Sequence, residues 1–205
     1  RARALISMAV SHQDGCRWDE AASLYERAID LFESHHGLCD AKAAARLQNN
    51  LAMVYREMDR GAEAESCYLK ALAHYKQLSD STLAGDLASL HGNLAYLYFD
   101  RGDFTTALQM QKQALDLTLH HLSHHPEWVY EAERRTGIFA YFADELETAL
   151  RHLKAAHQVL KDEDELGSSA AAELMVNIAA THLKSQRPKE ALAIYGDAAR
   201  LISQQ

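Results

Sequence analysis

The sequence predicts an all-α fold: a right-handed α-solenoid of five helical hairpins, with about ten helices in total. Three observations predict it. Small residues recur in three columns at intervals of 43 or 42 residues, and apolar residues between them follow helical spacing. The two prolines lie at expected helix boundaries, and no strand-like alternation with hairpin turns is present. A fixed internal period of this length is typical of stacked repeat units.

The three columns of small residues set the register of the units. The first is Ala9, Ala52, Ala95, Gly137 and Ala179, the second is Ala21, Ala64, Ala107, Ala149 and Ala191, and the third is Ala28, Ala71, Ala114, Ala156 and Ala198. The gaps within every unit are 12 and then 7 residues. Helices approach closely only where side chains are small. We therefore expect the first two columns to face each other inside a hairpin and the third to meet the next unit.

Two expected helices alternate in each unit. The first helices are expected over about 2–14, 40–58, 82–100, 127–143 and 168–185, and the second helices over about 18–35, 61–79, 104–122, 146–162 and 188–203. Pro126 and Pro188 suit the first turn of a helix, because a missing N–H costs nothing there. Ser168 suits the N-cap of the next helix. Gly37 and Gly167 suit the left-handed position that follows a helix end.

We expect one continuous array over residues 1–205, without an internal domain boundary. Its repeats are expected at about 1–37, 38–80, 81–123, 124–166 and 167–205. The chain is 48% hydrophobic and 24% charged, which fits a soluble protein, and its formal net charge is −8. It has no run of Lys and Arg and no long apolar stretch. We therefore expect neither a nucleic-acid partner nor a membrane partner.

The cysteines and the first residues favour a cytoplasmic location. Cys16, Cys39 and Cys67 are an odd number and show no CxxC spacing, which argues against a disulfide framework and a zinc site. No N-terminal apolar segment with a basic flank is visible. The chain begins with Arg1 rather than Met, which is compatible with a piece of a longer protein, so a removed N-terminal segment stays open.

The units resemble the tetratricopeptide repeat. The third unit carries the pattern most fully, as Asn93-Leu94-Ala95-Tyr96-Leu97-Tyr98, Arg101-Gly102-Asp103-Phe104, Ala107 and Ala114-Leu115. The period is longer than the roughly 34 residues usual for this repeat. It is similar to that of the long-helix subclass found in kinesin light chains and in several bacterial peptide-sensing regulators. The resemblance implies a non-enzymatic scaffold without a cofactor, which binds a protein or peptide in the concave groove of a superhelix.

The resemblance also implies that the first helices line this groove. Carried over position by position, it selects the amides Asn49, Asn50, Asn93 and Asn177, the arginines Arg46, Arg56, Arg134 and Arg135, and the aromatic residues Tyr96, Phe99 and Tyr141. An amide both donates and accepts hydrogen bonds, so a row of amides could hold an extended peptide backbone. The alternative is that each amide bonds to a neighbouring helix or to water.

The arginines and the aromatic residues can each have one of two roles. Guanidinium groups match carboxylates in two-point geometry, so the arginines could clamp an acidic ligand. Alternatively, they pair with Glu57, Glu131 or Glu173 of this chain. The aromatic side chains could form apolar pockets beside the arginines, or they could pack against neighbouring helices.

Four histidines are the only candidates for a metal site. His120, His121, His124 and His125 form two i, i+4 pairs if one helix continues through all of them, and such pairs can ligate a metal. Imidazoles near a helix C-terminus are also favoured by the helix dipole, so we expect no metal. GxSxG, HExxH and glycine-rich phosphate loops do not occur in the sequence, and we expect no enzyme.

Two further functions stay open. A repeat array needs a polar outer face at each end, and the last helix shows no polar capping helix after it. The terminal helices could therefore mediate homo-oligomerisation in a structural module. The chain could also be the sensory arm of a larger bacterial regulator, in which ligand binding changes the superhelical pitch. The sequence does not identify the ligand.

Overall fold

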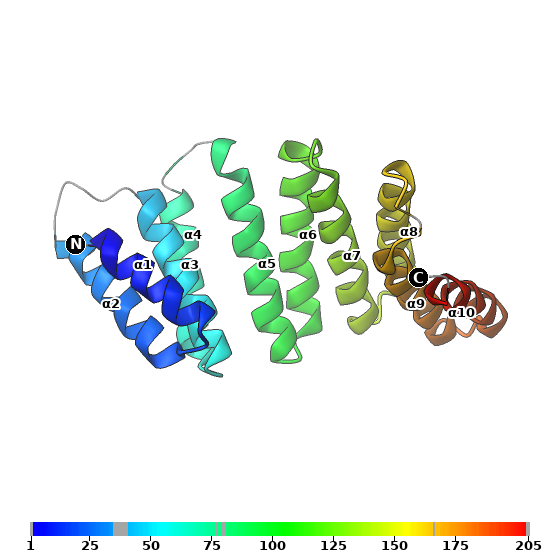
Figure 1. Cartoon of the computed structure of the whole chain (residues 1–205), viewed down its shortest axis with the longest axis horizontal. Helices are drawn as coiled ribbons and strands as arrows, with labels where there is room; N and C mark the ends of the chain where they lie inside the picture. Colours follow the sequence, from blue (N-terminus) through cyan, green and yellow to red (C-terminus); the bar gives the residue numbers. More distant parts are fainter. Residues whose placement is uncertain (1, 35–40, 77, 79–80, 166, 204–205) are drawn as a thin grey trace. The chain divides into compact units, whose positions relative to one another are not determined.

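The computed structural model describes residues 2–34, 41–76, 78, 81–165 and 167–203. In these residues the chain forms ten α-helices and one short 3-10 helix, Ser81–Leu83, and no β-strand (Figure 1). The first helices of the hairpins are α1 (Ala2–Asp14), α3 (Ala41–Glu57), α5 (Ala84–Asp100), α7 (Pro126–Phe142) and α9 (Ser169–Lys184). The second helices are α2 (Trp18–Ser34), α4 (Gly61–Lys76), α6 (Phe104–His121), α8 (Leu146–Asp162) and α10 (Pro188–Ile202). The predicted all-α hairpin fold is confirmed.

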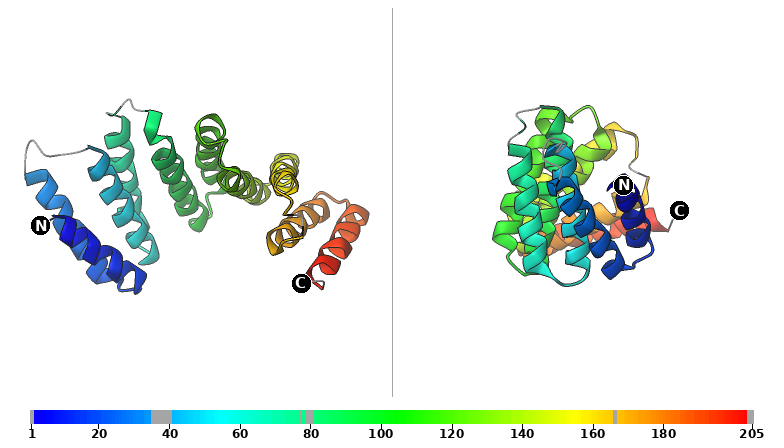
Figure 2. Two further views of the ribbon diagram at one scale, coloured as in Figure 1. Left: turned by 45° about the horizontal axis from the view of Figure 1, so that its top comes forward. Right: turned by 90° about the vertical axis from the view of Figure 1, so that its left-hand side faces the viewer.

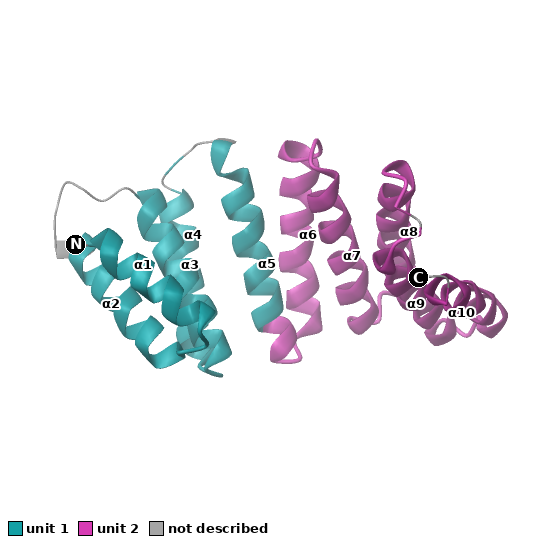
Figure 3. Cartoon of the chain, viewed as in Figure 1, with its two compact units in different colours: residues 1–97 teal, residues 98–205 magenta. Residues whose placement is uncertain are grey.

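The contacts divide the chain into two compact units, residues 1–97 and residues 98–205 (Figure 3). In unit 1, α1 packs on α2, α2 on α3 and α3 on α4. In unit 2, α6 packs on α7, α7 on α8, α8 on α9 and α9 on α10. The two helices of a hairpin lie side by side, as the pairs α1–α2 and α9–α10 show in Figures 1 and 2. The single continuous array stays a prediction.

The helix boundaries agree with the sequence to within two residues wherever both are described. Pro126 and Pro188 begin α7 and α10, as expected for proline. Ser168 caps α9, because its hydroxyl accepts a hydrogen bond from the Ala171 N–H at 3.2 Å. The ends expected at residues 35, 40 and 79 lie outside the described residues, and so does the proposed cap Gly37.

The prediction that Gly167 takes the left-handed position after α8 is wrong. The helix ends at Asp162, and Asp164 has the positive φ of 59°. Gly167 lies five residues beyond the last helical residue, so it does not follow the helix end directly. Aspartate enters the left-handed region more readily than most other side chains, so the chain needs no glycine to leave this helix.

Every turn inside a hairpin contains one left-handed residue. These residues are Cys16 (φ 54°), Asp59 (58°), Gly102 (78°), Asp144 (64°) and Gln186 (60°). Their spacing keeps step with the columns of small residues, so they form one more column of the repeat. Sequence reasoning missed this column because only one of its members is glycine.

All three columns of small residues lie in the core. The alanines of the first column are 0% exposed, and no alanine of the other two columns exceeds 5%. Gly137 is buried as well, and a Cβ atom there would lie 2.6 Å from Leu153 Cγ. The fourth hairpin therefore packs a leucine against a glycine where the other hairpins carry a methyl group.

The joint between α8 and α9 shows how one hairpin meets the next. Its core cluster consists of Leu150, Leu153, Ala156 and Leu160 from α8 with Ala171, Leu174 and Ile178 from α9. All seven are at most 6% exposed. Ala156 belongs to the third column, so this column meets the next hairpin here, as predicted. We call this cluster the α8–α9 joint.

Candidate functional site

The predicted amides of unit 1 are engaged with neighbouring helices. Asn93 on α5 donates from Nδ2 to Oδ1 of Asn49 on α3 at 3.0 Å. Asn50 hydrogen-bonds the Tyr25 hydroxyl, which itself donates to Oε1 of Gln13 at 3.0 Å. Burial raises the pKa of Tyr25, and the hydrogen bond with Asn50 opposes that rise. In unit 1 these side chains therefore tie first helices to their neighbours.

The predicted arginines of unit 1 are paired with carboxylates. Arg46 donates from Nε and Nη2 to both oxygens of Asp86, at 3.0–3.1 Å. Arg56 Nη2 lies 2.7 Å from Oε1 of Glu57, and its guanidinium carbon lies 5.8 Å from the centre of the Tyr96 ring. The pairing with Glu57 was one of the alternatives that the sequence left open, whereas Asp86 was not foreseen.

In unit 2, Arg134 and Arg135 share one carboxylate on α7. Arg134 donates from Nε and Nη2 to the two oxygens of Glu131 at 2.9 Å, and Arg135 Nε donates to Oε1 at 2.5 Å. Burial raises the pKa of Glu131, but the hydrogen bonds from both arginines outweigh it, and the pKa is lowered. The three side chains together carry a formal charge of +1.

Phe99 lies in an aromatic cluster of unit 2. Its ring centroid is 5.2 Å from that of Phe104 and 4.9 Å from those of Phe139 and Phe142. Phe99 therefore packs against neighbouring helices, which was the second interpretation that the sequence allowed for it. Tyr141 is placed differently, because it borders an open pocket.

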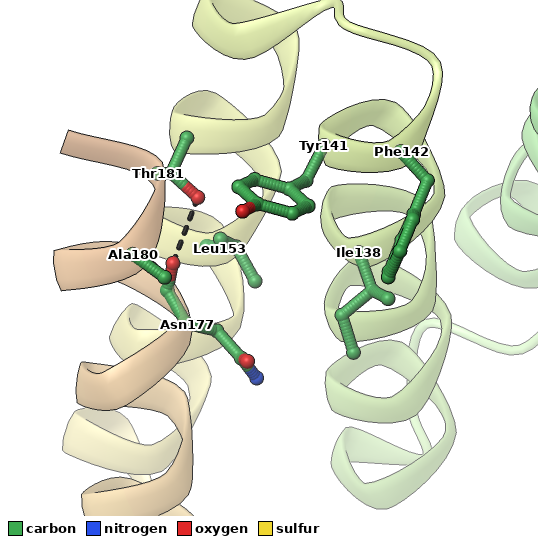
Figure 4. A pocket seen from close by; sticks show the side chains of 7 residues that line it. All are labelled: Ile138, Tyr141, Phe142, Leu153, Asn177, Ala180 and Thr181. Atoms are coloured by element: carbon green, nitrogen blue, oxygen red, sulfur yellow. Dashed lines mark hydrogen bonds between the residues drawn. The ribbon is translucent and has the colours of Figure 1, made fainter. Parts of the chain in front are cut away.

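This pocket lies between α7, α8 and α9 and has a volume of about 140 Å³ (Figure 4). Its lining consists of Ile138, Tyr141, Phe142, Leu153, Asn177, Ala180 and Thr181. We call it the α7–α9 pocket. A dry cavity of roughly 150 Å³ accommodates a benzene molecule, so the α7–α9 pocket has room for one branched or aromatic side chain. Most of its lining is apolar, which suits such an occupant.

Two polar groups at the α7–α9 pocket are unused by the described residues. Neither the side-chain amide of Asn177 nor the hydroxyl of Tyr141 has a hydrogen-bond partner there. Figure 4 shows the amide turned toward α7 and the hydroxyl turned toward α9. Thr181 is already engaged, because its hydroxyl donates to the Asn177 carbonyl oxygen at 2.7 Å. A ligand in the pocket would therefore meet one free amide and one free hydroxyl.

Lys184 holds the Tyr141 side of the pocket in place. Its Nζ lies 4.6 Å from the centre of the Tyr141 ring and donates to the Tyr141 carbonyl oxygen at 2.9 Å. The same ammonium group lies 3.0 Å from Oδ1 of Asp144 in the turn after α7. These contacts connect the end of α9 to the end of α7, so they help to fix the spacing of the two helices that border the pocket.

The four histidines do not share a helix, because α6 ends at His121 and a turn follows. The two i, i+4 pairs considered from the sequence therefore do not form on one helix face. His120 Nδ1 lies 2.8 Å from the Asp116 carbonyl oxygen, and the rings of His124 and His125 lie 4.3 Å apart. Over the described part of the chain, no group of three or more His, Cys, Asp or Glu could hold a metal ion.

The described cysteines are both free thiols. Cys16 is exposed and Cys67 is buried, and Cys39 lies outside the described residues.

No helix in the described part of the chain is long and apolar enough to cross a membrane.

Sequence reasoning missed a column of buried or half-buried polar residues on the first helices. Gln48, His91 and Glu133 occupy equivalent positions, four residues before the first alanine column. Glu133 Oε2 lies 2.6 Å from Nδ1 of His152 on α8, and burial lowers the pKa of His91. The repeat register alone could have revealed the column, because polar residues recur at one core position. None of the three residues lines the α7–α9 pocket, and Gln48 Oε1 and His91 Nδ1 have no hydrogen-bond partner among the described residues.

Comparison with known proteins supports the same family from sequence. Residues 43–120 match the family profile of the tetratricopeptide repeat. The chain is 28% identical over 131 residues to the mitochondrial tetratricopeptide repeat protein 19 homolog of Drosophila melanogaster. This alignment covers 64% of the chain and 32% of the relative, so the chain spans about a third of that protein's length.

Solved structures with the same fold are similar over nearly the whole chain. A putative kinesin light chain from Podosopora anserina, with nearly identical TPR-like repeats, gives a TM-score of 0.85 at 16% identity and covers 100% of this chain and 96% of its own. The apo form of RapI gives 0.82 at 15% identity, over 98% and 53%. YrrB, described as a TPR protein with an unusual peptide-binding site, gives 0.67 at 19% identity, over 98% and 86%. Residues 43–120 thus match tetratricopeptide repeats, and the hairpin fold is structurally similar to those of kinesin light chain-like and Rap-type proteins.

Proposed function

We propose that the chain binds an extended peptide segment at the α7–α9 pocket, with an apolar side chain in the pocket and the backbone held by Asn177. Tetratricopeptide domains generally act as protein-binding scaffolds and are typically non-catalytic. The proposal gives that general role a location on this chain, without catalysis and without a cofactor.

The free amide of Asn177 is the observation that carries the proposal. A peptide bond offers one donor and one acceptor, and a side-chain amide can satisfy both. Asn93 donates to Asn49 Oδ1 and Asn49 donates to Met53 Sδ, whereas the side chain of Asn177 has no hydrogen-bond partner among the described residues. Because Asn177 lies beside an apolar pocket, one ligand residue can use the amide and the pocket together.

The charges on α7 support a ligand with an acidic residue. Arg134 and Arg135 both bind the carboxylate of Glu131, so two guanidinium groups lie together on α7. Arg135 precedes Ile138 of the α7–α9 pocket by one helical turn, so the charged group and the pocket share a helix face. A carboxylate on the ligand would be attracted to these guanidinium groups and would favour the correct register of binding.

The experiment is a selection from a random peptide library displayed on phage, followed by affinity measurements with the enriched peptides. We expect enrichment of peptides with an apolar residue that fits a pocket of about 140 Å³. Replacing Asn177→Ala should then weaken binding about ten-fold, since a ligand loses hydrogen bonds to the amide. Ile138→Asp should weaken binding further because it places a charge in the apolar pocket.

Two matched variants keep the test specific. Gln113→Ala removes an exposed amide on α6 and should leave the affinity unchanged. Asn93→Ala removes an amide of the same repeat column that is already paired, and we expect less than a two-fold change in affinity. Equal affinities for the wild type, Asn177→Ala and Ile138→Asp would refute a ligand in this pocket.

A further inference from the structure

Leu153 on α8 differs from the residue that most other hairpins carry at its position. Four residues after the second column of small residues, the second helices carry Tyr25, Tyr68, Gln111, Leu153 and Tyr195. Tyr25 and Tyr68 are both 0% exposed, so their rings belong to the core. Leu153 lines the α7–α9 pocket, and in Figure 4 its side chain is seen between those of Tyr141 and Asn177. The pocket therefore lies where a shorter side chain stands in place of a core tyrosine.

The first hairpin shows what a ring at this position contacts. The Tyr25 hydroxyl donates to Oε1 of Gln13 on α1 at 3.0 Å and hydrogen-bonds Asn50 on α3. Gln13 is equivalent to Tyr141, since each lies four residues after the first column. Asn50 is equivalent to Asn177, since each lies two residues before it. Two residues that border the α7–α9 pocket are therefore the counterparts of the two hydrogen-bond partners of Tyr25.

The third hairpin uses rings from two first helices instead. Gln111 takes the tyrosine position there, and the ring of Phe99 stacks on that of Phe139 with centroids 4.9 Å apart. Phe99 is equivalent to Tyr141, and the equivalent of Phe139 is Thr181, which has no ring. The fourth hairpin therefore has neither the core tyrosine nor the stacked pair, and it is the hairpin that borders the α7–α9 pocket.

Gly137 leaves additional room beside Leu153. A Cβ atom at Gly137 would lie 2.6 Å from Leu153 Cγ, so the two positions are in direct contact. The hairpins that carry Tyr25 and Tyr68 have an alanine at the glycine position. Because those rings fit beside a methyl group, a ring beside Gly137 meets even less obstruction from this column.

We propose, as an extension that rests on the peptide site proposed above, that the ligand residue in the α7–α9 pocket is phenylalanine or tyrosine. Its single six-membered ring corresponds to the ring that Tyr25 supplies within unit 1. The rings of Tyr141 and Phe142 border the pocket, and pairs of aromatic rings attract each other beyond the effect of buried area. An aliphatic side chain lacks this attraction, and the double ring of tryptophan exceeds a space that accommodates benzene. Leu153 is then the residue that determines this specificity, because a longer side chain there would fill the pocket from inside.

The first experiment uses N-acetylated amino-acid amides as probes, because each carries one side chain between two peptide bonds. NMR titrations of the 205-residue chain give their dissociation constants. The phenylalanine and tyrosine amides should bind about two- to ten-fold more tightly than the leucine amide. The tryptophan amide should bind more weakly than the phenylalanine amide. A leucine amide that binds as tightly as the phenylalanine amide would overturn the proposal, and so would a chain that binds none of the amides at millimolar concentrations.

The second experiment restores the core tyrosine with Leu153→Tyr. The new ring should occupy the pocket, and its hydroxyl should hydrogen-bond Asn177, so the affinity for the phenylalanine amide should fall at least about ten-fold. The midpoint of chemical denaturation should stay the same or rise, because the space for the ring exists already. Leu174→Tyr is the matched control in the filled α8–α9 joint, where Leu174 is 0% exposed, and it should lower the midpoint. Leu119→Tyr changes an exposed leucine of α6 and should alter neither affinity nor midpoint.

Asn177→Ala separates failure of the aromatic specificity from failure of the peptide site. Binding of a library-selected peptide that falls with Asn177→Ala but not with Leu153→Tyr would overturn the proposal for the ring and keep the peptide site. Binding that neither variant changes would overturn both. A midpoint of Leu153→Tyr as low as that of Leu174→Tyr would also contradict a space of the size of a ring beside Gly137.

Discussion

The two units use the same repeat position in opposite ways. Asn93 in unit 1 and Asn177 in unit 2 are equivalent residues of their first helices. Asn93 closes a hydrogen bond with Asn49 of the previous first helix, whereas Asn177 faces the open α7–α9 pocket. The residue equivalent to Asn49 in unit 2 is Arg134, and it is engaged with Glu131. The same repeat position therefore holds an amide that is already hydrogen-bonded in unit 1 and an amide that is open to a ligand in unit 2. The difference depends on which residue the preceding first helix carries.

The first column of small residues has Ala52 in unit 1 and Gly137 at one position in unit 2. We expect the greatest change in the free energy of unfolding from a substitution in this column. Gly137→Ala should lower the free energy of unfolding by about 1–3 kcal/mol, because the new Cβ would meet Leu153. Chemical denaturation measures it. Gly196→Ala is the matched control on α10, since nothing lies within 4 Å of its Cβ, and it should stabilise the helix slightly. A Gly137→Ala variant as stable as the wild type would show that Leu153 moves aside freely.

The turns inside the hairpins provide the next comparison. Gly102→Ala in unit 2 should lower the free energy of unfolding by about 1–2 kcal/mol, because the residue has a φ of 78°. Asp59→Gly in unit 1 should raise it by less than about 1 kcal/mol, since aspartate tolerates the left-handed region better than most residues. Thermal and chemical denaturation of both variants would check the signs. If both substitutions changed the free energy of unfolding in the same direction, the two turns would not share a requirement for a left-handed residue.

A pair of alanine substitutions tests the two asparagines directly. Asn93→Ala should lower the free energy of unfolding by about 0.5–1.5 kcal/mol, because Asn49 Oδ1 loses its donor. Asn177→Ala should change it by less than about 0.5 kcal/mol, because no intramolecular hydrogen bond of the side chain is lost. Denaturation curves of both variants under one condition measure the two changes. A larger loss of stability in Asn177→Ala than in Asn93→Ala would contradict this expectation.

The smallest expected effect depends on pH. The pKa of Glu131 is lowered from its ordinary value of 4.5, so the carboxylate contributes stability above that value. The contribution is lost as the pH falls through the lowered pKa in the folded state. Glu131→Gln should therefore lie below the wild type in stability at pH 7, by less than about 1 kcal/mol, and approach it in acid. A difference that is constant with pH would exclude this ionisation as its cause.

The fold could be predicted because the repeat places equivalent residues at the same packing positions in every hairpin. Three columns of small residues predicted the hairpins, and Pro126, Pro188 and Ser168 predicted helix starts to within one residue. The column of left-handed residues was not predicted, because cysteine and glutamine, which occupy it at Cys16 and Gln186, are not typical of positions with positive φ. In a turn, the path of the flanking helices can impose a conformation that the residue itself does not favour.

The candidate site could be predicted only as a set of positions. Spacing selected the first helices and their polar residues, but it could not tell which polar groups the chain itself would satisfy. Asn49 and Asn93 lie 44 residues apart and still share a hydrogen bond, because consecutive first helices bring them together. Phe99 joins an aromatic cluster for the same reason, since its partners come from α6 and α7. Such contacts depend on side-chain rotamers across two helices, which a single column of residues does not encode.

NMR spectra of the side-chain amides, recorded during titration with a library-selected peptide, can distinguish Asn177 from the paired amides Asn49 and Asn93. We expect the Asn177 amide signals to shift in proportion to the bound fraction, while the Asn49 and Asn93 signals stay in place. A shift of the Asn93 signals with the Asn177 signals unchanged would contradict binding at the α7–α9 pocket, because the peptide would then break the hydrogen bond between Asn93 and Asn49.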